Sequence, residues 1–321
     1  YILDLEMADK SVEMCVTGGT GLIAGDLIRG LLQKGYTVRT TVRNPDILEK
    51  IGYLWELPGA KERLKIMKAD LLEEGSFDEA VNGVDGVFHT ASPVVAPQGQ
   101  NPKETLIDPC VGGTLNVLKA CSKSPTVRRV VLTSSCSSIR YDYNTLQRSP
   151  LDESHWSDPE YCKQYNLWYA YAKTLAEKEA WKYAEEQGLN LVVVNPSFVI
   201  GPLLAPKPTS TLHLVLSLMK GENDKVYPNI RLGFVHIHDV TTAHILAMEL
   251  PSASGRIICS GDVAHCGEIV MMLKEKFPQY PIADKCGTEQ GNDIPHTMNT
   301  SKIKSLGFGC FKSREQMLDD C

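Results

Sequence analysis

A glycine-rich segment near the start of the chain constrains the fold more than any other feature. Residues 17–24 read TGGTGLIA and lie between a short apolar run at 12–16 and an amphipathic stretch. A strand–turn–helix element of this kind can place a pyrophosphate against helix amides. Gly18 allows the tight turn, Gly21 lets the backbone approach the phosphates, and Ala24 lets the helix pack on the strand. The segment therefore predicts a dinucleotide site, and the alternative is a chance glycine-rich turn.

Strand-like runs alternate with helical patterns through the amino-terminal part of the chain. This alternation predicts right-handed crossovers and a parallel sheet covered by helices on both faces, the doubly wound α/β (Rossmann) class. Ligands of such sheets bind beyond the carboxyl ends of the strands. The predicted strands are 12–16, 37–42, 64–67, 86–88, 129–132 and 191–194.

Beyond residue 196 the alternation gives way to proline-rich loops, of which 201–208 (GPLLAPKP) is the clearest, and then to short mixed elements. A run at 256–259 again has the composition of a strand of the main sheet. We expect a smaller substrate-binding lobe that interleaves with the dinucleotide-binding domain. The expected division is 12–196 with 235–259 for the dinucleotide-binding domain, and 197–234 with 260–321 for the substrate lobe.

Composition narrows the class of partner. The 321 residues are 43% hydrophobic and 22% charged, with a formal net charge of -6, as in a globular enzyme that does not bind nucleic acid. The ten cysteines form no Cys-x-x-Cys motif and no metal-ligand spacing, which favours free thiols in a reducing compartment and no metal. No run reaches the roughly 20 apolar residues of a membrane span. We expect a cytoplasmic protein, free or at the surface of the endoplasmic reticulum.

A tyrosine and a lysine far downstream predict the chemistry. Tyr169 and Lys173 stand four residues apart in a helical stretch, so they share one face, whereas Tyr171 faces elsewhere. A cation beside a phenol stabilises the phenolate and makes the phenol a better acid near neutral pH. Ser135 ends the run VVLTSS (130–135) and supplies a second hydroxyl. The pattern predicts carbonyl reduction: a nicotinamide hydride attacks the carbon, Tyr169 protonates the oxygen and Ser135 positions it. The alternative is a pair of surface residues on an aromatic helix.

Basic residues after the second predicted strand indicate which nicotinamide cofactor is used. An acidic residue there would bind the ribose 2′-hydroxyl, whereas a basic one favours a 2′-phosphate. Arg43 ends this strand and Lys50 follows it, so NADPH is favoured over NADH, although Asp46 lies nearby and both cations could be solvated surface charges. Asp70, after the third strand, is expected at the adenine or else as a helix cap.

Several motifs together resemble a known family. The chain is similar to the plant extended short-chain dehydrogenases/reductases of the dihydroflavonol reductase and cinnamoyl-CoA reductase superfamily over nearly all of its length. The motifs that carry the resemblance are residues 16–24, 36–43, 88–93 (FHTASP), 133–135, 151–154 (LDES), 173–177 (KTLAE) and 234–236. The resemblance places Ser135, Tyr169 and Lys173 at the catalytic positions, Arg43 and Lys50 at the 2′-phosphate, and Pro196 and Ser197 beside the nicotinamide carboxamide. The other expected contacts of NADP(H) are Gly18, Thr20, Gly21, Leu22, Ile23, Asp70, Leu71, Thr90, Ala91, Ser92, Thr133, Ser134, Val199 and Ser210.

Within this superfamily, residues 134–141, 165–173 and 201–212 most resemble tetraketide α-pyrone reductases. Such enzymes reduce a ketone on the alkyl arm of a polyketide pyrone on the route to sporopollenin, and other enzymes of that pathway are expected partners. Arg140 replaces the residue that reads the flavonoid B-ring, and Gly233 replaces a polar residue, which argues against a dihydroflavonol. Leu167 and Ala170 break the Asn-Trp-Tyr-Cys-Tyr pattern of cinnamoyl-CoA reductases.

The expected substrate is a hydrophobic carbonyl compound. The residues expected to contact it are Ser92, Pro93, Arg140, Phe198 and Leu212, with Val94, Val95, Leu203 and Leu204 as further apolar lining. Arg140 could hydrogen-bond a pyrone oxygen, or it could pair with Asp142.

Four other interpretations stay open. The same superfamily contains dihydroflavonol, cinnamoyl-CoA and aldehyde reductases. An NADP-sensing binding protein would keep the glycine-rich turn without turnover, but such proteins typically lose Tyr169 and Lys173. A sugar-nucleotide epimerase or dehydratase would usually hold NAD through an acidic residue at the position of Arg43. His236, His238 and Asp239 could suggest a metal site, although an N-cap by Asp239 and core packing suit their spacing better.

Overall fold

A seven-stranded parallel sheet forms the centre of the molecule in a computed structural model that describes residues 12–94, 99–208 and 210–321, with only the backbone of Ser210. The strand order is β10-β6-β5-β4-β1-β2-β3, and every neighbouring pair is parallel. All six predicted strands are confirmed to within two residues at either end. The strands are β1 (Glu13–Thr17), β2 (Thr37–Val42), β3 (Leu64–Lys68), β4 (Gly86–His89), β5 (Arg129–Thr133), β6 (Leu191–Pro196) and β10 (Gly255–Cys259).

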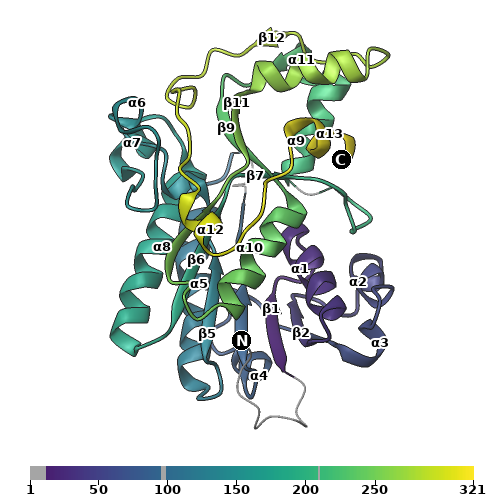
Figure 1. Cartoon of the computed structure of the whole chain (residues 1–321), viewed down its shortest axis with the longest axis vertical. Coiled ribbons are helices and arrows are strands. Elements are labelled where there is room, and N and C mark those ends of the chain that lie inside the picture. Colours follow the sequence, from purple (N-terminus) through teal and green to yellow (C-terminus); the bar gives the residue numbers. More distant parts are fainter. Residues whose placement is uncertain (1–11, 95–98, 209) are drawn as a thin grey trace.

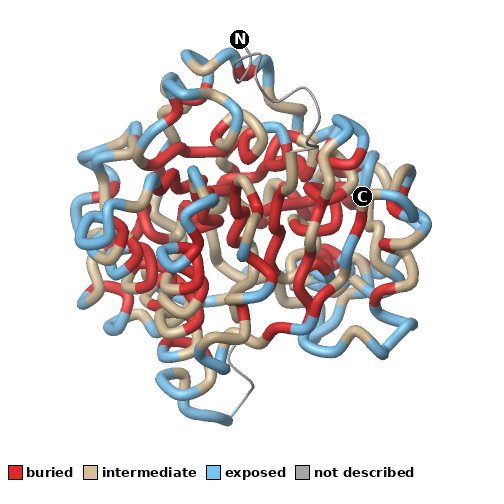
Figure 2. The backbone as a smooth tube through the Cα atoms, turned by 90° about the horizontal axis from the view of Figure 1, so that it is seen from below, coloured by how far each residue is buried: buried red, intermediate tan, exposed pale blue. Residues whose placement is uncertain are grey.

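Helices cover both faces of this sheet, as Figure 1 shows. On one face α1 (Leu22–Gln33) packs against α10 (Ile237–Glu249), and on the other α5 (Asp108–Lys123) packs against α8 (Trp168–Gln187). The central strands are therefore buried from both sides, and every residue of β6 is buried. Figure 2 shows the same arrangement as a buried central layer inside an exposed outer layer. Such strands need continuous apolar sequence, which is why the sequence pattern located them.

The strand order reverses between β1 and β4. From β1 the chain builds outward to β2 and β3, and it then returns to add β4, β5 and β6 on the other side of β1. The connections that leave the carboxyl ends of β1 and β4 therefore build the sheet in opposite directions. Ligands of doubly wound sheets bind at this switch point.

A smaller part of the molecule lies beyond that edge, at the top of Figure 1. Its three-stranded sheet has the order β11-β9-β7, with β7 parallel and β11 antiparallel to β9. The expected segment 235–259 contains elements of both parts. Val235 and His236 lie in β9, in the smaller part. After them, α10 packs on the main sheet and β10 pairs with β6 as its last strand. The elements of this part are β7 (Phe198–Ile200), α9 (Ser210–Lys220), β8 (Val226–Tyr227), β9 (Arg231–His236), β11 (Asp262–His265), α11 (Cys266–Lys276), β12 (Lys285–Cys286) and α13 (Arg314–Asp319).

Short helices complete the connections. They are α2 (Leu48–Trp55), α3 (Ala60–Arg63), α4 (Asp78–Val81), the π-helix η1 (Lys103–Ile107), the 3₁₀ helices η2 (Cys136–Ser138) and η3 (Asn223–Lys225), α6 (Thr145–Arg148), α7 (Pro159–Gln164) and α12 (Ser301–Ser305). The cysteines are free, as expected, and seven of them, Cys15 and Cys259 included, are buried. Within the described ranges, no helix is both long and apolar enough to cross a bilayer.

The cap of α10 differs from the sequence prediction. His236, not Asp239, is the N-cap residue, and its Nδ1 accepts a hydrogen bond from the backbone N–H of His238 at 3.1 Å. Asp239 lies inside the first turn, where its carboxylate accepts from the backbone N–H of Lys312 at 3.0 Å. The first N–H groups of a helix have no partner within the helix, and an imidazole nitrogen can accept one of them as a carboxylate does. Because His236 is both the last residue of β9 and the cap of α10, the strand passes directly into the helix. Among the residues that the structure describes, no group of three or more His, Cys, Asp or Glu side chains could hold a metal ion.

Candidate active site

The carboxyl edge of the main sheet gathers most of the predicted site residues. The glycine-rich turn follows β1, residues 90–93 follow β4, and Ser135 follows β5. The amino-terminal half of α8 crosses the same edge and contacts η2, the short helix that begins directly after Ser135. Four segments that are distant in sequence thus meet at the carboxyl edge of the sheet, at and beside the switch point.

Ser135, Tyr169 and Lys173 come together there. Lys173 is buried, and its Nζ donates a hydrogen bond to the backbone carbonyl of Thr133 at 3.0 Å. The Ser135 hydroxyl and the Lys173 ammonium lie close enough to the phenol of Tyr169 that both act to lower its pKa. The Ser135 Oγ also accepts the backbone N–H of Ser137 at 3.1 Å, so its own proton is free to donate. Tyr171 lies outside this group, with the Lys163 ammonium 5.3 Å from its ring centre.

The acidity of Tyr169 differs from the sequence expectation. Burial raises the pKa of its phenol above the usual value of 10.0, and the Lys173 charge and the Ser135 hydroxyl oppose that rise without reversing it. Tyr169 is therefore protonated at neutral pH, which is the form that a proton donor needs. The contribution of Lys173 is to lower the free energy of the phenolate once the proton has left.

The glycine-rich turn is held against two other strands. Gly18 has a φ of +74°, and a Cβ there would lie 3.0 Å from the Cα of Ala91. Gly19 donates its N–H to the Thr41 carbonyl at 2.9 Å, and a Cβ on Gly19 would come within 2.4 Å of the Thr40 Oγ1. Sequence reasoning assigned a role to Gly18 and none to Gly19, because the clash depends on how β2 lies against the turn.

A second hydrogen-bonded group, which sequence reasoning also missed, fixes the end of β4. The Thr17 Oγ1 accepts the backbone N–H groups of Thr90 and Ala91, both at 3.1 Å, and lies 2.9 Å from the Nδ1 of His89. Its single proton must therefore go to His89, which makes that Nδ1 an acceptor and leaves the proton of the ring on Nε2. Burial lowers the pKa of His89 to about 3, so the ring is neutral. Only the pairing of β1 with β4 brings these residues together.

The basic residues assigned to the 2′-phosphate lie at the exposed rim of the candidate site. Arg43 and Lys50 are both exposed beyond the end of β2. The neighbouring carboxylate of Glu49 is paired with Lys207 at 2.7 Å, which ties α2 to the loop after β7. Asp70 stabilises the turn after β3, since its Oδ1 accepts the N–H of Leu72 at 3.0 Å, and it caps no helix.

Other expected cofactor residues have side chains that face the protein interior. The Thr133 hydroxyl lies 2.7 Å from the Nε2 of His244, and the Ser134 hydroxyl donates to Glu177 at 2.5 Å. Ser197 donates to the hydroxyl of Ser260 at 2.7 Å, and Val199 is packed in the main core. Their side chains are therefore already bonded or packed within the protein. The side chain of Ser210 lies outside the described part of the chain.

Arg140 is almost fully bonded within the protein. Its guanidinium donates to the backbone carbonyl of Arg231 at 2.6 Å and to the side-chain oxygen of Asn292 at 2.8 Å, and it contacts the hydroxyl of Tyr141. The alternative pairing with Asp142 is wrong, because Arg148 binds that carboxylate at 3.1 Å. Burial of the guanidinium inside the fold requires these nearby acceptors.

The expected apolar lining divides into two groups. Phe198 packs edge to face on Phe234 in the smaller part of the molecule, with 5.6 Å between ring centres. Leu212, on α9 of the same part, is buried. Leu203 and Leu204 instead line a narrow crevice over the glycine-rich turn, next to Gly21 and Tyr53. Ser92 and Pro93 lie half-buried after β4, with Ser92 Oγ 3.5 Å from the Sγ of Cys110, and Val94 is exposed. Val95 falls outside the described residues.

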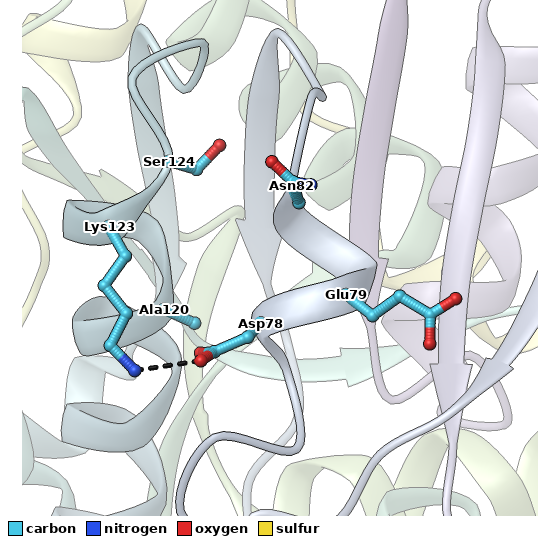
Figure 3. Close-up of a pocket in the computed structure, with 6 residues that line it drawn as sticks. All are labelled: Asp78, Glu79, Asn82, Ala120, Lys123 and Ser124. Atoms are coloured by element: carbon cyan, nitrogen blue, oxygen red, sulfur yellow. Dashed lines mark hydrogen bonds and ion pairs between the residues drawn. The ribbon is translucent and has the colours of Figure 1, made fainter.

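A separate hollow lies at the opposite edge of the sheet. Figure 3 shows its lining by α4 and the end of α5, with the ammonium of Lys123 2.9 Å from the carboxylate of Asp78. Both helices lead directly into the starts of β4 and β5, so this hollow lies at the amino edge. It contains none of the predicted site residues. Its lining residues are Asp78, Glu79, Asn82, Ala120, Lys123 and Ser124.

Comparison with known proteins agrees with the family that the sequence motifs resemble. Residues 14–259 match the model of the NAD dependent epimerase/dehydratase family. The chain is 63% identical over 310 residues to tetraketide alpha-pyrone reductase 2 of Arabidopsis thaliana, with 96% of each chain covered. It is 46% identical to a cinnamoyl-CoA reductase of Medicago truncatula, covering 92% of this chain and 90% of the relative. Among solved structures, the yeast methylglyoxal/isovaleraldehyde reductase Gre2 complexed with NADPH aligns with a TM-score of 0.82 at 27% identity, over 96% of both chains.

Proposed function

Because the chain belongs to the NAD dependent epimerase/dehydratase family, we propose that it is an NADPH-dependent ketoreductase. Its substrate is a tetraketide α-pyrone, and the reaction converts the ketone on the alkyl arm into a hydroxyl group. The single observation that carries the chemistry is the meeting of Ser135, Tyr169 and Lys173 at the carboxyl end of β5, one strand beyond the switch point of the sheet. The identity of 63% to a tetraketide alpha-pyrone reductase, against 46% to a cinnamoyl-CoA reductase, supports the substrate class.

The residues around the glycine-rich turn fit a dinucleotide. Side chains at Gly18 and Gly19 would collide with Ala91 and Thr40, so the backbone is bare where a pyrophosphate would approach. The first turn of α1 has no side-chain cap and no acidic residue, which leaves its amides available to an anion. In this arrangement residues 18–23 would hold the pyrophosphate, and Arg43 with Lys50 would hold the 2′-phosphate.

The chain's own residues carry the proton. NADPH supplies the hydride that reduces the carbonyl carbon. Ser135 donates a hydrogen bond to the carbonyl oxygen and Tyr169 transfers its phenolic proton to the same oxygen as the C–O double bond becomes single. Lys173 keeps two N–H groups beyond its bond to Thr133, and one of them stabilises the Tyr169 phenolate until solvent restores the proton. The products are the hydroxy-pyrone and NADP⁺.

The biological setting follows from this substrate. A hydroxylated tetraketide pyrone is a precursor of sporopollenin, so the protein works in the cytoplasm, free or at the surface of the endoplasmic reticulum, beside other enzymes of the polyketide pathway. Co-purification of this chain with a polyketide synthase from the same tissue would support the partnership.

A substrate panel tests the proposal. NADPH oxidation is followed with a keto-alkyl α-pyrone, a dihydroflavonol, a hydroxycinnamoyl-CoA and a simple aldehyde at matched concentrations. We expect kcat/KM for the keto-pyrone to exceed the others by at least about 100-fold, since a site built for one oxygen pattern rejects others. Reaction with the thioester or the flavonoid alone would overturn the substrate assignment, and no reaction with any member, despite tight NADPH binding, would favour an NADP-sensing protein.

A further inference from the structure

We propose that Glu177 and Arg256, a buried ion pair beneath the candidate active site, are positioning residues that fix the hydroxyl of Ser135. The inference deepens the proposed function and rests on the role assigned there to Ser135. Glu177 accepts the hydroxyl of Ser134, the residue before Ser135, and neither charged side chain is more than 7% exposed. The evidence is a continuous set of hydrogen bonds from the two charges to the backbone of Ser135.

Glu177 lies on α8, one turn beyond Lys173 and two beyond Tyr169, and its side chain has no exposed surface. One carboxylate oxygen, Oε2, accepts the hydroxyl of Ser134 at 2.5 Å and the amide of Asn195 at 3.0 Å. The other, Oε1, accepts the Nε–H of Arg256 at 2.6 Å. The buried carboxylate is thus satisfied from both sides, as a buried charge must be.

Arg256, the other member of the ion pair, is also held by several contacts. It comes from β10, and its side chain is only 7% exposed. Besides Glu177, the guanidinium donates to the backbone carbonyl of Glu153 at 3.1 Å and contacts that of His155. It also lies over the ring of Trp156, with its Cζ 3.8 Å from the ring centre. The cation therefore ties the loop at 153–156 to the interior of the sheet.

Ser138 connects the ion pair to Ser135. Its single hydroxyl proton is shared between two acceptors, the Glu177 carboxylate at 2.6 Å and the Ser135 carbonyl at 2.7 Å, while its Oγ accepts the amide of Asn195 and an N–H of Arg256, each at 3.1 Å. The Asn195 amide also reaches the Ser135 carbonyl, at 3.3 Å. The Ser135 backbone is thus held through its carbonyl, and its neighbour Ser134 is held through its hydroxyl.

This arrangement fixes where the Ser135 hydroxyl points. Ser135 is the N-cap of η2, and its Oγ accepts the N–H of Ser137, so any rotation of this turn moves the Oγ away from Tyr169. Every partner of the Glu177 carboxylate is a hydrogen-bond donor. A displaced or shortened carboxylate therefore loosens Ser134, Ser138 and Asn195 together, and a misplacement of the order of 1 Å at a reacting group costs up to about 100-fold in rate.

The test uses Glu177→Asp. Aspartate keeps the negative charge, but its side chain is one methylene shorter, so the carboxylate moves away from its hydrogen-bond partners. With whichever carbonyl compound the enzyme reduces, we expect kcat to fall about 10-fold to 100-fold, while the dissociation constant of NADPH stays within about 2-fold. The matched control is Glu13→Asp, because Glu13 pairs with Arg39 through two bonds of 2.8 and 2.6 Å at the amino edge of the sheet. We expect the control to lose comparable thermal stability and to keep its kcat.

A double-mutant cycle separates positioning from a general loss of structure. If the pair acts through the Ser135 hydroxyl, Glu177→Asp has little further effect on kcat once Ser135→Ala has removed that hydroxyl. A full 10-fold to 100-fold effect of Glu177→Asp in the Ser135→Ala background would overturn the inference and leave the proposed function standing. Unchanged kcat in Ser135→Ala alone would overturn both. Arg256→Lys keeps the charge without the forked donor geometry, and we expect it to reproduce the kcat loss of Glu177→Asp.

Discussion

The inner and outer ends of the candidate site use charge in opposite ways. At the inner end, Glu177 and Arg256 are buried, and each makes several hydrogen bonds that leave the neighbouring groups one arrangement. At the outer end, Arg43 and Lys50 are exposed, and the ion pair between Glu49 and Lys207 lies in solvent. Buried charges can hold a reacting hydroxyl in place, whereas exposed ones can only select a ligand by its charge. Substitutions at the two ends should therefore differ in what they damage.

The largest expected effect lies in a second buried group at the carboxyl edge of the sheet, the hydrogen bonds around Thr17. Thr17→Val keeps the shape of the side chain but removes the acceptor of two backbone N–H groups and the donor to His89. We expect a loss of about 3 kcal/mol or more in the free energy of unfolding, because three groups lose their partner at once. Urea denaturation measures it. In the control Thr40→Val only one hydrogen bond is lost, to the Val16 carbonyl, and a loss equal to that of Thr17→Val would contradict the account.

Acidification should act on buried histidines rather than on the exposed charges of the outer end. Burial lowers the pKa of His89 to about 3 and that of His244 to about 4, below the value of about 6.5 in the unfolded chain. The unfolded state therefore binds protons first, so the stabilisation is complete above pH 6.5 and is lost as the pH falls toward the folded pKa values. The two rings together should lower the free energy of unfolding by about 2 kcal/mol between pH 6.5 and pH 5.5. Equal unfolding midpoints in urea at both pH values would show that neither ring is held neutral.

A charge reversal at the rim should change ligand choice and leave stability intact. In Arg43→Glu the 2′-phosphate of NADPH would meet a carboxylate, so we expect the dissociation constant of NADPH to rise about 10-fold to 100-fold while that of NADH changes little. Titration of nicotinamide fluorescence measures both constants. Arg43→Lys, the control, keeps most of the affinity. Equal weakening of both cofactors would remove Arg43 from the phosphate site.

The smallest effect is expected at the exposed ion pair between Glu49 and Lys207. Lys207→Ala removes a cation whose contact lies in solvent, where such pairs contribute little to stability. We expect Tm and kcat to match those of the unaltered protein within experimental error. A clear rise in the KM for NADPH would instead indicate that the loop at 202–207 covers the cofactor, since Leu203 and Leu204 lie beside Gly21.

The sequence predicted the main sheet because its strands carry a local signal. Strands buried on both faces, such as β6, appear as continuous apolar runs whatever their neighbours are. The smaller part of the molecule gave no such signal. Its strands β8 and β12 have two residues each, and β7 has three, so their existence depends on pairing across the fold rather than on local pattern.

The same distinction applies to the site. Tyr169 and Lys173 could be paired from the sequence because one helical turn separates them. Glu177 and Arg256 are 79 residues apart, and only the pairing of β10 with β6 brings them together. The partners of Arg140 were equally out of reach, since Arg231 and Asn292 belong to distant segments and the nearby Asp142 is bound by Arg148. Local spacing cannot indicate which of several acceptors a buried guanidinium will meet.

The central claim is that Tyr169 delivers the proton while Ser135 and Lys173 stabilise the charge that moves. The most direct measurement is the single-turnover rate of NADPH oxidation by Tyr169→Phe with saturating carbonyl substrate. Phenylalanine keeps the ring and removes only the hydroxyl, so the account predicts a rate about 1000-fold lower than that of the unaltered protein, with NADPH affinity and Tm preserved. A folded Tyr169→Phe protein that oxidises NADPH at the original rate would contradict it.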